Sequence, residues 1–138
     1  MFFRYGLIAL AVGQASTGLW ALVAPRSFYD NFPAGRGGWV SSLGPYNEHM
    51  TIDYGALSLA IVSVLVVAAI ALERRLILVA AGAYLVWSVP HFVYHMVTLD
   101  AYDAGDAIGN AITLAFTVVL PVWILARARR APDLRPAT

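Results

Sequence analysis

The sequence predicts an all-α fold, a bundle of four transmembrane helices. Apolar residues make up 60% of the 138 residues and charged residues only 12%, whereas an average soluble domain has roughly 45–50% and about 25%. The apolar residues are also gathered into four runs, each close to the roughly 20 residues that a spanning helix needs. A soluble domain of this length buries only about two-thirds of its chain surface, so we expect lipid to cover the excess apolar surface.

The four predicted spans belong to a single integral membrane domain, residues 1–138, and run over residues 5–24, 50–72, 76–98 and 107–126. In the first run, Gly13-Gln14-Ala15 could pass as a signal-peptide cleavage site. The apolar residues continue to Ala24, so we expect a spanning helix instead. Only Glu73-Arg74-Arg75 separates the second and third spans, which predicts a tight antiparallel hairpin.

The distribution of arginine predicts the orientation. With four spans, seven of the nine basic residues fall on one side of the membrane: Arg4, Arg74, Arg75, Arg127, Arg129, Arg130 and Arg135. Loops rich in arginine stay in the cytoplasm, so both termini are predicted to be cytoplasmic. Loop 25–49 and the short acidic loop before the fourth span then face outward.

The outer loop, residues 25–49, is the longest stretch predicted to lack a helix. It contains three prolines and five aromatic residues: Phe28, Tyr29, Phe32, Trp39 and Tyr46. Long loops in compact domains are usually functional or disordered, and aromatic residues favour the headgroup level of a membrane. We expect the loop to fold over the outer mouth of the bundle. An interfacial anchor without chemistry is the alternative.

Each span also carries polar or small residues at steps of three and four, which places them on one helical face. The four faces are Ala11, Gln14, Gly18 and Ala21; His49, Asp53, Ala56, Ala60 and Ser63; Tyr84, Ser88, His91 and His95; and Asp106, Asn110, Thr113 and Thr117. Lipid does not solvate polar side chains, so these faces are expected to meet in a polar seam.

One cluster within this seam predicts a metal site. His91 and His95 are four residues apart, as are His49 and Asp53, and the hairpin brings both pairs to a similar depth near the outer face. Imidazole and carboxylate ligands suit zinc, copper or iron. The predicted supporting residues around this site are Glu48, Tyr84, Asp106 and Asn110.

Two other interpretations of the same residues stay open, namely a proton relay or polar ligand pocket and a closed structural hydrogen-bond network. Other classes are excluded. The net charge is +1 and lysine is absent, which argues against an extended nucleic-acid surface. The absence of cysteine excludes disulfides. No phosphate-binding loop or nucleophile elbow is present, so no catalytic residue is assigned.

The opening helix carries a family resemblance. Arg4-Tyr5-Gly6, Gly18-Leu19-Trp20 and Pro25, together with the four spans, resemble the small bacterial membrane proteins called DoxX-like. The resemblance implies a multi-pass protein of the bacterial inner membrane, which in some members is a subunit of a quinone-linked redox system. If the chain is an enzyme, oxidoreduction fits best. The alternative is a non-catalytic membrane subunit or scaffold that binds a protein partner or a second copy, with a purely structural seam.

Overall fold

The computed structural model describes residues 1–131. Four long helices dominate it, namely α1 (Phe2–Val23), α3 (Glu48–Ala71), α4 (Arg74–Val97) and α5 (Ala104–Arg130). All four are long and apolar enough to cross a membrane. The described residues contain no strand, which confirms the all-α prediction, and each predicted span overlaps one of these helices along most of its length.

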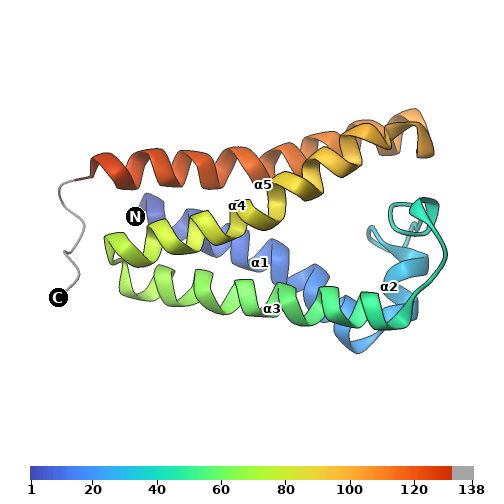
Figure 1. The fold of residues 1–138 in the computed structure, drawn as a ribbon, viewed down its shortest axis with the longest axis horizontal. Helices are drawn as coiled ribbons and strands as arrows, with labels where there is room; N and C mark the ends of the chain where they lie inside the picture. Colours follow the sequence, from blue (N-terminus) through green and yellow to red (C-terminus); the bar gives the residue numbers. More distant parts are fainter. Residues whose placement is uncertain (132–138) are drawn as a thin grey trace.

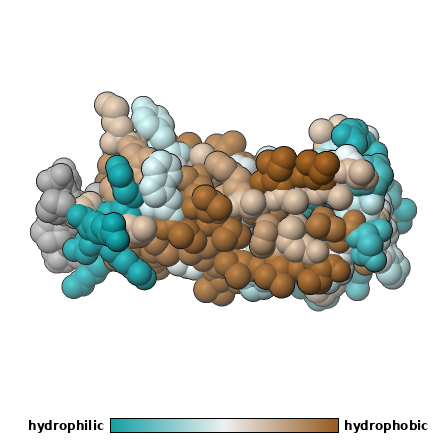
Figure 2. Space-filling model, turned by 90° about the horizontal axis from the view of Figure 1, so that it is seen from above, coloured by the Kyte–Doolittle hydropathy of each residue, from teal (hydrophilic) through white to brown (hydrophobic). Residues whose placement is uncertain are grey.

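The surface supports this assignment. On the face seen in Figure 2, apolar residues cover the middle of the molecule and hydrophilic residues gather towards its two ends. Many large apolar side chains lie at the surface, such as Val67, Val86 and Val119, which are 53%, 77% and 63% exposed. An apolar surface of this extent is typical of contact with a bilayer.

The two ends of the molecule differ in their elements. The N-terminus, the α3–α4 turn and the last residues of α5 lie at one end (Figure 1), which we call the basic end. Six of the seven arginines predicted on one side belong to these segments, while Arg135 lies outside the described residues. The opposite loop end holds α2 (Pro25–Asn31), η1 (Ser41–Leu43) and η2 (Leu99–Ala101).

Local sequence signals set the helix boundaries. The side chain of Asn47 accepts a hydrogen bond from the Met50 amide, and Asp103 accepts one from the Asp106 amide, so both act as N-caps. At the basic end, α3 is followed by its C-cap residue Leu72 in the left-handed conformation, with φ of 53°. Glu73 follows and α4 begins at Arg74, which gives the tight hairpin expected from the sequence.

The half of the bundle near the basic end is packed solid. Its core is formed by apolar residues from all four long helices: Leu7, Leu10, Ala11, Leu65, Ala68, Ala69, Ile77, Ala80, Ala81, Tyr84, Ile124 and Ala128. Towards the loop end, α1 and α3 remain in close contact through Gly18 and Gly55. A methyl group placed on Gly55 would lie 2.7 Å from the amide nitrogen of Leu22.

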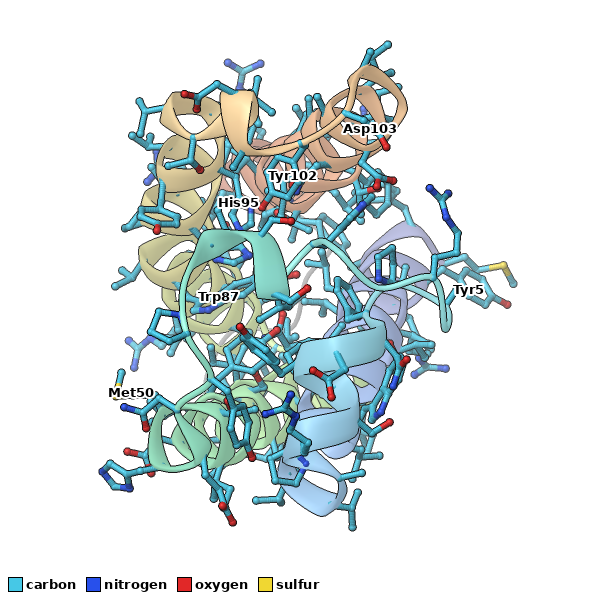
Figure 3. The ribbon with its side chains drawn as sticks, turned by 90° about the vertical axis from the view of Figure 1, so that its right-hand side faces the viewer. Tyr5, Met50, Trp87, His95, Tyr102 and Asp103 are labelled. Carbon is cyan, nitrogen blue, oxygen red and sulfur yellow. The ribbon has the colours of Figure 1, made fainter. Side chains whose placement is uncertain are left out.

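Residues 25–47 are not the irregular loop that the sequence predicts, because α2 and η1 form within them. Pro25 occupies the first turn of α2, where its missing amide costs no hydrogen bond. The segment crosses the loop end of the four-helix bundle (Figure 3). The expectation that it folds over the mouth of the bundle is thus met, and we refer to residues 25–47 as the roof.

The predicted polar faces are only partly correct. On α1 all four predicted residues are buried, and on α4 Tyr84, Ser88 and His95 are buried. On α3 the prediction is wrong, because Ala56, Ala60 and Ser63 lie at the surface. That helix instead turns Gly55 and Ser58 towards α1. Their small size allows the closer approach of backbones, and this contact decides which face is inward.

Candidate functional site

A cavity of about 640 Å³ lies between the four helices beneath the roof. At the loop end, α1 and α3 lie on one side and α4 and α5 on the other (Figure 1). The two helix pairs diverge here, whereas near the basic end they are packed against each other. The cavity walls include Leu10, Gln14 and Thr17 of α1, Tyr84, Trp87, His91 and His95 of α4, and Asn110 and Leu114 of α5. A cavity of this size suits a small-molecule ligand.

The roof is aromatic and is attached to both sides of the cavity. Phe28 stacks on Tyr54 of α3, with ring centroids 5.7 Å apart, and its edge meets Trp20 of α1. On the opposite side, the Arg36 guanidinium lies 2.8 Å from the Asp106 carboxylate of α5. The Tyr102 hydroxyl also donates to the Trp39 carbonyl oxygen over 2.9 Å. These contacts attach the roof to both helix pairs above the cavity.

His95 is the centre of a polar cluster on the wall made by α4 and α5 (Figure 3). Its Nδ1 lies 3.2 Å from Asn110 Nδ2 and 3.1 Å from the Tyr102 hydroxyl. These two neighbours occupy Nδ1, so Nε2 is the ring nitrogen that they leave open. His95 and Asn110 are both buried. The cluster therefore holds the imidazole in one orientation against the cavity.

His91 lies one turn before His95 and also lines the cavity. Its ring stacks on Trp87 with centroids 4.9 Å apart, and the His95 ring meets it edge-on at 4.6 Å. We find no hydrogen bond to His91 among residues 1–131. The ring nitrogens of this imidazole are thus left for a bound molecule. Pro90 just before it does not interrupt α4.

A second polar group faces the cavity from α1. Gln14 donates through Nε2 to the Ser58 hydroxyl at 2.9 Å, which leaves its carbonyl oxygen as an acceptor. The Thr17 hydroxyl donates to the Gln14 backbone oxygen and accepts from the Tyr54 hydroxyl at 3.1 Å. Gln14, Thr17 and Tyr54 all line the cavity. Hydrogen-bonding groups are thus present on opposite walls.

The cavity wall carries no arginine, aspartate or glutamate among the residues that the structure describes. Its ionisable groups are histidine and tyrosine side chains. Burying a formal charge without a partner is expensive, so this wall suits an uncharged molecule. It does not provide the paired charges that a phosphate or an ammonium group would need.

The structure does not bring the four predicted metal ligands together. His49 and Asp53 form a pair at 3.3 Å on the outside of α3, with side chains 81% and 50% exposed. Neither lines the cavity that His91 and His95 face. Over residues 1–131 there is no group of three or more histidine, cysteine or acidic side chains that could hold a metal ion. The pair His49 and Asp53 is therefore on the exposed side of α3, whereas the pair His91 and His95 lines the cavity.

Of the four predicted supporting residues, two lie at the cavity and two do not. Asn110 and Tyr84 lie in the cavity wall, while Asp106 pairs with Arg36 above it. Glu48 is exposed in the first turn of α3.

Sequence reasoning missed Trp39 and Tyr102, which bind His95 to the roof, and Trp87, which supports His91. The spacing of four between Trp87 and His91 could have indicated the stacked pair. No sequence signal indicated Tyr102, because its contacts depend on how the short loop after α4 folds.

Comparison with known proteins gave no relative. No family model matches the chain, and neither a curated protein nor a solved structure matches it.

Proposed function

We propose that this chain is a multi-pass membrane protein that binds an uncharged, lipophilic small molecule in the cavity at its loop end. The observation that carries the proposal is the composition of the cavity wall, which is aromatic and apolar, free of arginine and carboxylates, and supplied with a few buried hydrogen-bonding side chains. Ligand sites commonly combine apolar walls with a few placed polar groups. His95 and Gln14 would position the polar part of the ligand, and the aromatic residues its apolar part.

The hydrogen-bond pattern defines the polar part of this ligand. His95 presents Nε2, because Asn110 and Tyr102 occupy Nδ1. Gln14 presents its carbonyl oxygen as an acceptor, because Ser58 occupies Nε2. A molecule with a hydroxyl group near His95, which can donate or accept, and a hydroxyl or amide N–H group near Gln14 would satisfy both. The proposed ligand thus has two polar groups and is apolar elsewhere.

The test is to identify what copurifies with the protein. Protein extracted in a mild detergent should release a discrete compound into organic solvent, detected by mass spectrometry. Leu114→Trp places a large side chain in the cavity wall and should abolish that signal. Gly82→Trp is the matched control, because Gly82 lies outside the cavity wall and a Cβ there meets no atom within 4 Å. Equal amounts of compound from all three proteins would contradict the proposal.

A second candidate function is a metal centre, favoured by the proximity of His91 and His95. Their rings are 4.6 Å apart, on one face of α4. Two imidazoles leave coordination positions open, so a bound molecule would have to complete the site. Zinc, copper or iron would suit these ligands. A redox role, which the family resemblance implies, would depend on this candidate.

Metal analysis separates the two candidates. If His91 and His95 hold the metal, His91→Ala and His95→Ala should each remove it, and His49→Ala should not. If the four-residue site predicted from the sequence is correct, His49→Ala and Asp53→Ala should remove it too. Metal-free protein that still carries the lipophilic compound would favour the ligand-binding function alone. Protein with neither would favour a structural subunit that binds a partner.

We also propose that the protein lies in a bacterial inner membrane with its basic end in the cytoplasm. The arginines of the basic end support this orientation through the positive-inside rule. A periplasm-dependent reporter fused after Thr138 should be silent, and one inserted near Asp103 should be active. The opposite pattern would place the cavity at the cytoplasmic face.

A further inference from the structure

We propose that the ligand reaches the cavity sideways from the bilayer, through a portal between α1 and α5. This inference rests on the proposed function, and it adds the route of access and the residues that control it. The portal is formed by cavity-lining residues that also lie at the surface of these two helices: Ala9, Gly13, Thr113 and Phe116.

The portal exists because α1 and α5 touch in the packed half and separate beyond it. At Gly6, a methyl group would lie 3.1 Å from Ile124 of α5, so the two helices are in contact there. Two turns later, a methyl group on Gly13 would meet no atom within 4 Å, although Gly13 lines the cavity. On the α5 side, Phe116 lines the cavity and is 55% exposed. The gap between these residues thus connects the cavity with the outer surface.

The depth of the portal indicates what it opens to. Gly13 lies near the middle of α1, about 15 Å from either end at a rise of ~1.5 Å per residue. Phe116 lies close to the middle of α5. The hydrocarbon core of a bilayer is about 30 Å thick, so a helix that spans it places its middle among acyl chains. An uncharged lipophilic molecule is concentrated in that region.

At the loop end, the roof is attached to both helix pairs through Phe28, Arg36 and Tyr102, so we expect it to restrict access from the aqueous side. A second exposed rim carries Met50 of α3 and Tyr94 of α4, which both line the cavity. This rim lies in the first turn of α3 and the last turn of α4, at the level of the headgroups. It is the competing route that the experiment must exclude.

The experiment uses photolabelling in phosphatidylcholine vesicles. An uncharged aryl diazirine dissolved in the bilayer is activated by light, and the labelled residues are mapped by mass spectrometry. In the unmodified protein, residues inside the cavity such as Trp87 and Tyr84 should be labelled. Gly13→Trp and Thr113→Trp, which narrow the portal from opposite sides, should each reduce this labelling to the level of an unirradiated sample. Surface labelling of Val67 and Val119 should be unchanged and shows that the protein is folded and inserted.

The controls address the other routes. Gly82→Trp, at an open position away from the cavity, and Met50→Trp, at the competing rim, should leave labelling of Trp87 unchanged. Arg36→Ala, which releases one attachment of the roof, should not increase it. Loss of labelling with Met50→Trp, an increase with Arg36→Ala, or labelling of Trp87 by a charged, water-soluble diazirine would overturn the portal. Because the probe is not the natural ligand, these results do not depend on whether a compound copurifies.

Discussion

The two halves of this bundle are built from the same four helices but are filled differently. Near the basic end, Leu7, Leu65, Ile77 and Ile124 are each 0% exposed and fill the space between the helices. Near the loop end, the corresponding space is a cavity of about 640 Å³. The difference shows that one half of the bundle maintains the fold, and that the second half is then free to be hollow.

The contact between α1 and α3 is the exception within the hollow half. Gly18 and Gly55 bring these two helices together beside the cavity, and Gln14 and Ser58 are hydrogen-bonded across the same contact. This pair of helices therefore forms a fixed wall. The opposite wall, made by α4 and α5, contains His91, His95 and Asn110. The following substitutions test this division, from the largest expected effect to the smallest.

Gly55→Ala should give one of the two largest losses of stability. The added methyl group would lie 2.7 Å from the Leu22 amide nitrogen and 2.8 Å from the Gly18 carbonyl oxygen, and backbone atoms have little freedom to move away. Overpacking costs about 1–3 kcal/mol, and a backbone clash belongs at or above the upper limit. Thermal unfolding in detergent measures the loss. Gly82→Ala, where a methyl group meets no atom within 4 Å, should melt within error of the unmodified protein; equal losses would contradict the tight contact.

Shortening a leucine side chain should cost more stability in the packed half than in the hollow half. Leu65→Ala removes a fully buried side chain from the packed half, and such changes cost about 2–5 kcal/mol. Leu43→Ala shortens a partly exposed side chain that already faces the cavity. It should cost clearly less, because few contacts are lost. Comparison of the two unfolding free energies checks this, and a larger loss for Leu43→Ala would mean that the cavity is not hollow.

Tyr102→Phe should have a moderate effect that depends on pH. It removes the hydroxyl that donates to the Trp39 carbonyl, a contribution of about 1 kcal/mol. Burial raises the pKa of Tyr102 above its ordinary value of 10.0. The folded state thus favours the neutral phenol, and its contribution is complete below pH 10 and lost as the pH rises through the raised pKa. Stability profiles of the two proteins should converge in alkali, and a constant difference would argue against the assigned hydrogen bond.

Arg36→Ala should have the smallest effect. The Arg36 side chain is 68% exposed, although its partner Asp106 is only 15% exposed. Exposed ion pairs contribute at most about 1 kcal/mol and are weakened by salt. We expect a small decrease in melting temperature at low ionic strength that disappears in high salt. A large, salt-independent decrease would show that the ion pair is a main attachment of the roof.

The spans were predictable because their signal is local. Length, hydropathy and the Glu73-Arg74-Arg75 turn are all properties of neighbouring residues. Burial of His95 and Asn110 also followed from spacing, since both lie on faces whose polar residues lipid does not solvate.

The inward face of α3 was not predictable in the same way. His49 and Asp53 mark one face of this helix and Gly55 and Ser58 another, and periodicity alone does not rank them. The contact with Gly18 and Leu22 of α1 decides the outcome. Spacing within α3 does not reveal this long-range contact. We therefore predicted one site of His49, Asp53, His91 and His95, whereas the structure separates the two pairs. The cavity depends in the same way on how the helix pairs diverge and not on any single motif.

Native mass spectrometry of the protein released from lipid nanodiscs tests the central claim most directly, that the hollow half holds a ligand. The unmodified chain should appear with one additional mass, well defined and present at a ratio of one to one. His95→Phe should weaken this adduct, and Leu114→Trp should abolish it. Gly82→Trp should retain it. A chain that carries no adduct, or one whose adducts are a broad series of lipids unaffected by His95→Phe and Leu114→Trp, would contradict a specific binding cavity.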